Sequence, residues 1–156
     1  MKLYHTSDLI VKTPDILHSR DYLDFGKGFY LTHLKDQAER YGARFIRRGK
    51  EAWLNIYEFE IQTDSWDVKE FYQYNREWLD FVGRCRNGID NTKHDLIIGG
   101  IANDKVIRTL DRYFNGDITE EEALGLLKFE KPNIQYCIRS QEILDSCLKF
   151  IDSIQL

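Results

Sequence analysis

The stretch Asp24-Phe25-Gly26-Lys27-Gly28-Phe29-Tyr30-Leu31-Thr32 restricts the fold more than any other part of the chain. Two glycines flank a lysine, and a short aromatic strand is predicted over residues 27–31. Glycines at such positions let the backbone approach a ligand closely. The spacing is not that of a phosphate-binding loop, Gly-x-x-x-x-Gly-Lys-Ser/Thr. On these residues alone, a ligand site and a hairpin turn with core aromatics are equally good interpretations.

Hydrophobic spacing predicts regular elements on both sides of this stretch. Leu34, Ala38, Tyr41 and Phe45 fall on one face of a helix, for which Thr32 is the expected N-cap. Other helices are predicted over 68–86, 103–114, 119–128 and 140–151, and strands over 1–6, 52–61, 95–101 and 135–139. Because these elements are interspersed without regular βαβ alternation, the predicted fold class is α+β, in a single domain of residues 1–156.

The composition excludes several classes of protein. The chain has 156 residues, of which 42% are hydrophobic and 13% aromatic, so a disordered chain is not expected. Lys and Arg number 22 against 26 Asp and Glu, and the net charge of -4 argues against a general nucleic-acid binder. No apolar run approaches the roughly 20 residues that a membrane span needs, so no membrane partner is expected.

The three cysteines, Cys85, Cys137 and Cys147, have no zinc-ligand spacing and make an odd number. We interpret them as reduced thiols, mostly buried, in a cytoplasmic protein. No cluster of His, Cys and Asp has ligand spacing either, so no metal is expected.

Two further segments carry polar residues on predicted strands. Tyr4-His5-Thr6-Ser7 ends the first strand, and Ile134-Gln135-Tyr136-Cys137-Ile138-Arg139 forms a late one. Taken singly, a histidine hydrogen-bonded at a strand edge and a solvent-facing edge glutamine are the better interpretations.

Taken together, the three segments resemble the ADP-ribosyltransferase superfamily, most closely its diphtheria-toxin-like branch, which includes the poly-ADP-ribose polymerases. Phe25 to Tyr30 is similar to the Phe-Gly-Lys-Gly-Ile-Tyr run of that branch. Tyr41 follows Tyr30 at the interval of the family's second active-site tyrosine, and Tyr4 to Ser7 is similar to its His-Gly-Ser motif.

The chain also resembles a bacterial domain-of-unknown-function family assigned to that superfamily. The likeness lies in Asp24 to Tyr30, in Glu77-Trp78-Leu79-Asp80-Phe81-Val82 and in Asp95-Leu96-Ile97-Ile98-Gly99. The resemblance implies a split β-sheet core with flanking helices, and NAD as co-substrate.

The resemblance also assigns roles to single residues. Tyr30 and Tyr41 would sandwich the nicotinamide ring, because aromatic faces stack on a flat cationic ring. His5 would bond a ribose hydroxyl, and the Thr6 backbone would hold the carboxamide. The implied catalytic residues are His5, Tyr41 and Gln135, and the implied NAD-binding residues are His5, Thr6, Arg20, Gly28, Tyr30 and Tyr41, with Arg20 near the adenosine half.

Two positions depart from the family pattern. Thr6 stands where the family commonly has glycine, and its side chain is expected to crowd the pocket. Gln135 stands in the place of the family's glutamate. A neutral amide can position a ribose by hydrogen bonds, but it cannot stabilise a developing oxocarbenium ion by charge. Asp104 or Glu130 is a candidate substitute for that carboxylate.

We therefore expect a mono-ADP-ribosyltransferase that moves ADP-ribose from NAD to a protein or nucleic-acid acceptor, as a bacterial toxin or defence effector with a possible antitoxin. Slow NAD hydrolysis is a related outcome. The alternative is a module that binds NAD or ADP-ribose without efficient turnover. RNA 2′-phosphate transfer is disfavoured, because the four histidines do not form the motif of that branch.

Overall fold

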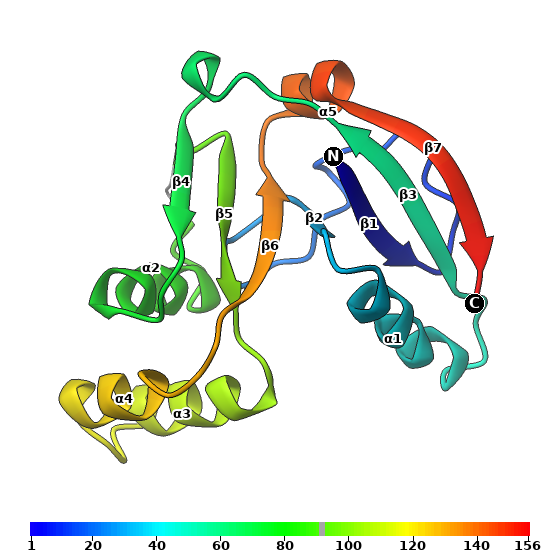
Figure 1. Ribbon diagram of the computed structural model, residues 1–156. Helices are drawn as coiled ribbons and strands as arrows, with labels where there is room; N and C mark the ends of the chain where they lie inside the picture. Colours follow the sequence, from blue (N-terminus) through cyan, green and yellow to red (C-terminus); the bar gives the residue numbers. More distant parts are fainter. Residues whose placement is uncertain (91–92) are drawn as a thin grey trace.

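The computed structural model describes residues 1–90 and 93–156. Within them the chain forms one seven-stranded mixed sheet and five α-helices, an α+β fold as predicted (Figure 1). In chain order the elements are β1 (Lys2–Ser7), β2 (Phe29–Thr32), α1 (Lys35–Ile46), β3 (Trp53–Phe59), the 3-10 turn η1 (Thr63–Ser65), β4 (Val68–Phe71), α2 (Arg76–Arg86), β5 (Leu96–Ile101), α3 (Asp104–Phe114), α4 (Glu120–Leu127), β6 (Asn133–Ile138), α5 (Gln141–Cys147) and β7 (Leu148–Gln155).

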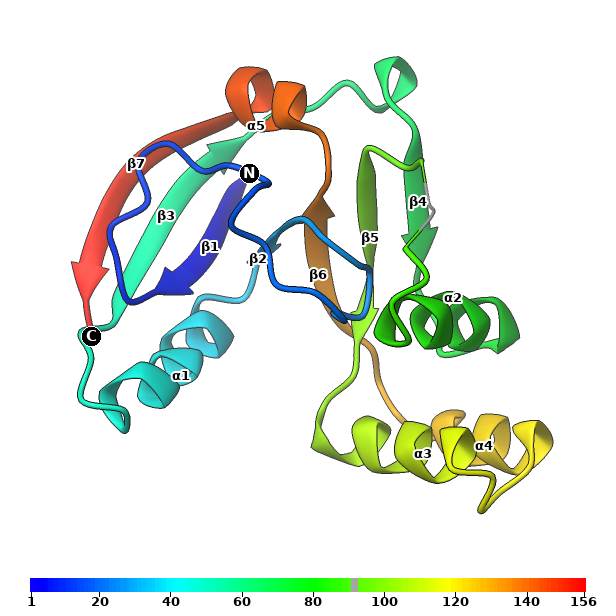
Figure 2. The same cartoon turned by 180° about the vertical axis from the view of Figure 1, so that it is seen from behind.

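The strands lie in the order β4-β5-β6-β2-β1-β3-β7, and only β4 and β5 are parallel. β1 pairs with β3 along its whole length, but it meets β2 at a single register pair, Tyr4 opposite Thr32. The two halves of the sheet diverge on either side of this seam between β2 and β1 (Figures 1 and 2).

The apolar core is divided between the two faces of the sheet. One cluster lies under α2, α3 and α4 and includes Phe25, Trp78 and Leu110, each fully buried. The other includes Leu3 and Tyr57, also fully buried, and packs against α5 and the segment before β2. Since each buried large apolar side chain contributes about 1.5–3 kcal/mol, the two clusters fix the helices on their faces.

α1 packs on β1 and β3, where Thr6 Oγ1 donates a hydrogen bond to the carbonyl of Ala38 at 2.6 Å. The predicted helix is confirmed, but its predicted cap is wrong. Leu34 occupies the N-cap position without a side-chain bond, whereas the Thr32 hydroxyl accepts from Leu34 N at 3.1 Å and donates to Gln37 Oε1 at 2.9 Å. Thr32 is held in β2, too early in the chain to cap the first turn.

The helix predicted over 68–86 is in fact a strand followed by a helix. Val68 to Phe71 form β4, which pairs with Leu96 to Gly99 of β5, and α2 begins only after Asn75, whose side chain accepts from Trp78 N. The helical spacing of Phe71 and Trp78 came from two elements that face the same cluster. Pairing with a buried strand outweighed local helical preference.

The helix predicted over 140–151 is also too long. α5 ends at Cys147, and β7 continues from Leu148 along β3 to Gln155. By contrast, the helix predicted from Asn103 is confirmed, and so is the capping box at the start of α4, where Thr119 and Glu122 bond each other's backbone amides. In the described part of the chain, no helix is both long and apolar enough to cross a bilayer.

Candidate functional site

An ion pair holds the glycine loop, residues 24–28, against the end of β6. Arg139 pairs with Asp90 through Nη2–Oδ1 at 2.9 Å and Nη1–Oδ2 at 3.1 Å, and Nη1 also donates to the carbonyls of Phe25 and Lys27 at 3.0 and 2.7 Å. Lys27 N donates to Asp90 Oδ2 at 2.9 Å. One guanidinium therefore fixes both ends of the Gly26 turn, and two-pronged pairs of this kind are geometrically specific.

The two glycines of the loop are required by contacts within the protein. Gly26 has φ +75°, and a Cβ on it would overlap Asp90 Oδ2. A Cβ on Gly28 would lie 2.5 Å from Cys137 Sγ. The space beside Gly28, which the sequence suggested for a ligand, is thus taken up by Cys137 of β6.

Asp24 anchors the start of the same loop. It pairs with Arg86 of α2 at 2.8 Å through Oδ1, and its Oδ2 accepts from Ala102 N at 2.8 Å. The loop is consequently tied to α2, to the segment after β5 and to the end of β6, which together present β2 in one fixed position.

Tyr30 is the aromatic residue of β2 that faces the glycine loop. Its phenol donates to the Gly26 carbonyl at 2.6 Å and accepts from Phe25 N at 3.1 Å. Burial, reinforced by the neighbouring Cys137 thiol, raises the pKa of Tyr30 well above its usual value. The phenol is therefore neutral, and its two hydrogen bonds hold the ring against the loop.

His5 lies on β1 beside β2. Its Nδ1 is 2.8 Å from the Tyr30 carbonyl oxygen, and its ring packs against Phe29 with centroids 4.3 Å apart and planes tilted by 33°. Burial lowers the pKa of His5, opposed by the hydrogen bond to Tyr30. Because a carbonyl can only accept, Nδ1 of the neutral ring carries the proton, and Nε2 is left as an acceptor.

The register of the strands decides which side chains share a face. Side chains alternate along a strand, so Tyr30 and Thr32 point to one face and Phe29 to the other. Gln135 lies opposite Thr32 and therefore shares the face of Tyr30, the face that α1 covers. The structure brings Tyr30, Gln135 and α1 together there, whereas the His5 ring lies with Phe29 on the opposite face of the sheet.

Tyr41 projects from α1, and its phenol oxygen accepts a hydrogen bond from Arg20 Nη2 at 3.1 Å. The Arg44 guanidinium lies 4.8 Å from the centre of its ring. The segment that carries Arg20 is tied to the glycine loop, since Gly28 N donates to Ser19 Oγ at 2.9 Å. Arg20 and Tyr41 thus form a contact between that segment and α1.

Four further residues of the predicted site remain, and only Thr6 among them forms a side-chain hydrogen bond within the described residues. Thr6 is buried, and its hydroxyl bonds Ala38 in α1. Within residues 1–90 and 93–156, the Gln135 amide has no hydrogen-bond partner, and neither Asp104 nor Glu130 bonds it or forms an ion pair. Asp104 is exposed at the start of α3, and Glu130 is half-buried before β6.

Residues 1–150 match the model of a protein family described as "Protein of unknown function (DUF3990)". The chain belongs to the DUF3990 family. The match includes every candidate residue named above, from His5 on β1 to Gln135 on β6. No curated protein and no solved structure matches the chain.

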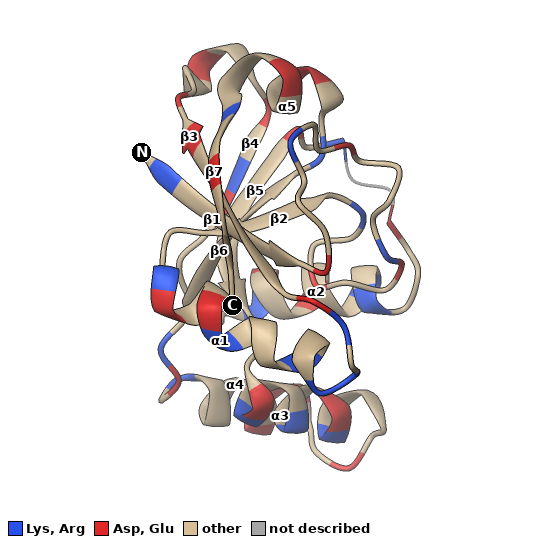
Figure 3. Cartoon of the chain, turned by 90° about the vertical axis from the view of Figure 1, so that its right-hand side faces the viewer, with Lys and Arg blue, Asp and Glu red and all other residues tan. Residues whose placement is uncertain are grey.

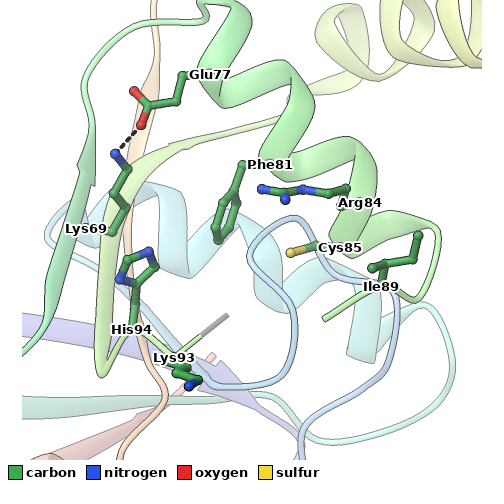
Figure 4. Close-up of a pocket in the computed structure, with 8 residues that line it drawn as sticks. All are labelled: Lys69, Glu77, Phe81, Arg84, Cys85, Ile89, Lys93 and His94. Carbon is green, nitrogen blue, oxygen red and sulfur yellow. Dashed lines mark hydrogen bonds and ion pairs between the residues drawn. The ribbon is translucent and has the colours of Figure 1, made fainter. Parts of the chain in front are cut away.

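Sequence reasoning missed the two residues that fix the glycine loop of this DUF3990 protein. Asp90 lies in a connecting segment, and Arg139 ends a strand, so neither stands out by its position. Only paired variation among relatives would have linked them. It also missed a cavity beside α2, which none of the predicted site residues lines (Figure 4). In the part of the chain that the structure describes, no three His, Cys, Asp or Glu side chains gather as a metal site.

Proposed function

We propose that this DUF3990 protein binds NAD in an ADP-ribosyltransferase-like site and transfers ADP-ribose to a protein or nucleic-acid acceptor. The adjacency of β6, β2 and β1 supports this most directly, because it sets Gln135, Tyr30 and His5 on three neighbouring strands beside the seam. A cytoplasmic bacterial toxin or defence effector, held in check by an antitoxin, is the setting that the sequence resemblance suggests.

Two tyrosines would hold the nicotinamide. Tyr30 is fixed by its phenol to the glycine loop, and Tyr41 stands on the helix that covers the same face. A flat cationic ring between two aromatic faces gains both stacking and cation–π attraction, about 0.5–2 kcal/mol for each face. Arg20, already beside Tyr41, would turn to the adenosine half of the nucleotide.

His5 would act mainly by positioning. Its Nδ1 proton holds the carbonyl of Tyr30, and so holds the strand that presents the stacking ring. Its Nε2 is left as an acceptor on the face opposite Tyr30, so a ribose hydroxyl would bond it only from that face of the seam. The Thr6 backbone would hold the carboxamide, while the Thr6 side chain stays engaged with α1.

Gln135 determines how fast the bond to nicotinamide can break. Cleavage leaves positive charge on the ribose, which a carboxylate stabilises and an amide does not. Gln135 can still orient the ribose 2′-hydroxyl by hydrogen bonds. Slow transfer of single ADP-ribose units, or slow NAD hydrolysis, is therefore expected in place of polymer synthesis.

A second function is favoured by one observation. No carboxylate bonds Gln135 within the described residues, so nothing there restores the missing negative charge. The domain would then bind NAD or ADP-ribose without efficient turnover.

The test is nicotinamide release from NAD by the purified protein, with Tyr41→Ala and Tyr72→Ala compared. Tyr72 is 58% exposed and lies between β4 and α2, so it is a matched control for the loss of a tyrosine ring. Release that is lost in Tyr41→Ala and kept in Tyr72→Ala supports the transferase. Saturable NAD binding without release, again lost only in Tyr41→Ala, supports the binding module. If the wild-type protein neither binds NAD nor releases nicotinamide, both proposed functions are overturned.

A further inference from the structure

A cavity of about 330 Å³ opens between β4, α2 and three described residues before β5, namely Ile89, Lys93 and His94 (Figure 4). It is lined by residues that the proposed NAD site does not use. Those that matter for its chemistry are Lys69, Glu77, Phe81, Arg84, Ile89 and Lys93. Ligand cavities in proteins span roughly 300–1,000 Å³, so this one suits a small ligand.

The cavity carries uncompensated positive charge. Lys69 forms an ion pair with Glu77, but neither Arg84 nor Lys93 has an ion-pair partner among the described residues. Asp80, which flanks Arg84 in an adjoining hollow, forms no ion pair with it in that set. Elsewhere in the fold, basic and acidic residues are interspersed along α1 and α3 (Figure 3). Two unpaired cations over one hollow attract an anion.

One wall of the cavity is apolar. Phe81 lies at its centre, with the Arg84 guanidinium 5.9 Å from the ring centroid, and Ile89 stands at the rim with 54% of its surface exposed (Figure 4). A guanidinium held against an aromatic ring keeps its outward N–H groups available as donors. Phe81 itself is only 7% exposed, so the cavity joins a small exposed part of its ring and the Ile89 side chain to two cationic donors.

A carboxylate completes the set at the other end. Glu77 bonds Lys69 and still has acceptor capacity, because a carboxylate has about four lone-pair sites. The cavity thus offers cations for an anion at one end, an apolar patch in the middle and an acceptor for N–H groups at the other end. These features match the phosphate, the base and the amino group of a nucleotide.

We propose that this cavity binds a nucleotide monophosphate. The phosphate lies between Arg84 and Lys93, the base packs against Phe81 and Ile89, and Glu77 accepts from an amino group of the base. The site goes beyond the proposed NAD chemistry and needs none of its residues. The nucleotide is either free or the terminal unit of a single strand.

The test is calorimetric titration of the full chain with adenosine 5′-monophosphate at low salt. Arg84→Gln/Lys93→Gln is compared with Arg47→Gln/Arg48→Gln, which removes the same charge from the exposed end of α1. Tyr41→Ala keeps the cavity and disables the proposed NAD site. Adenosine and a short oligoadenylate are titrated in parallel.

We expect saturable binding that weakens at least about tenfold in Arg84→Gln/Lys93→Gln and stays unchanged in the other two variants. Adenosine binds more weakly than its monophosphate. Tighter binding of the oligoadenylate identifies a strand as the source, and weaker binding identifies the free nucleotide. No binding by the wild-type protein up to roughly 5 mM, or an equal loss in the α1 control, overturns the proposal. Loss in Tyr41→Ala alone would place the nucleotide in the NAD site and overturn it as well.

Discussion

The imidazole of His5 donates from Nδ1 to the carbonyl oxygen of Tyr30 at 2.8 Å, across the seam where the two halves of the sheet diverge. β1 and β2 share only the Tyr4–Thr32 register pair, so this side chain supplies a bond that the backbone ladder lacks. A histidine that the sequence suggested as a ligand contact is thus also part of the joint between β1 and β2.

Stability should fall as the medium becomes acidic, through His5. Burial lowers the pKa of His5 in the folded protein, so the unfolded chain takes up this proton first, near pH 6.5. The free energy of unfolding therefore declines below about pH 6.5, by up to roughly 1.4 kcal/mol per pH unit, until the folded-state pKa is reached. Urea unfolding between pH 5 and 8 should show this dependence of the unfolding free energy on pH in the wild-type protein and a shallower one in His5→Gln. Equal slopes would contradict it.

Alanine at Gly26 should cost more stability than alanine at Gly49. Both glycines have positive φ, +75° and +70°, so the left-handed backbone penalises each alanine by about 1–2 kcal/mol. Only at Gly26 would the new Cβ also overlap Asp90, whereas nothing lies within 4 Å at Gly49. The midpoints of urea unfolding measure the difference. Equal losses of stability in the two variants would show that the glycine loop rearranges to accommodate the new Cβ.

Breaking the pair of Asp90 and Arg139 should release the glycine loop. Asp90→Asn and Arg139→Met each leave a partner mostly buried, and we expect a loss of about 2–4 kcal/mol for either change. The double variant should lose less stability than the two single variants together, because the second change removes the charge that the first change leaves unpaired. Lys27→Met, which removes the exposed pair with Asp21, should cost under about 1 kcal/mol. Additive losses in the double variant would count against a coupled pair.

Gln135→Glu should raise NAD cleavage. The substitution restores negative charge on the face that Tyr30 and α1 share, next to the place proposed for the ribose. Electrostatic groups of this kind are worth about 10²–10³ in rate, so a gain of at least tenfold in nicotinamide release is expected. Gln73→Glu, at an exposed position between β4 and α2, is the control for the added charge and should leave the rate unchanged. An unchanged rate in Gln135→Glu would remove position 135 from the chemistry.

The sequence predicted α1, α3 and α4 well, because their apolar spacing and caps are local. It failed at β4 and β7. Val68 to Phe71 and Leu148 to Gln155 are edge strands, and their apolar residues continue the spacing of an adjacent helix. When the apolar residues of a strand fall at the helical spacing of the neighbouring helix, no local signal marks where one element ends and the other begins.

For the candidate site, the glycine loop and the Tyr30 strand were predictable from residue types. The face of His5 was not, because it depends on a register pair between β1 and β2. The Asp90–Arg139 pair joins residues 49 positions apart, and sequence spacing carries no information at that distance.

The place of β6 in the sheet bears on how the protein is made. Residues 133–138 are synthesised after both of their neighbours, yet they lie between β5 and β2 in the middle of the sheet. A nascent chain still short of this segment lacks the strand that joins β4 and β5 to β1 and β2, as well as Gln135 and Arg139. Such long-range pairing slows folding and favours completion of the sheet in one late step. During translation the proposed NAD site therefore cannot form before residues 133–138 have joined the sheet.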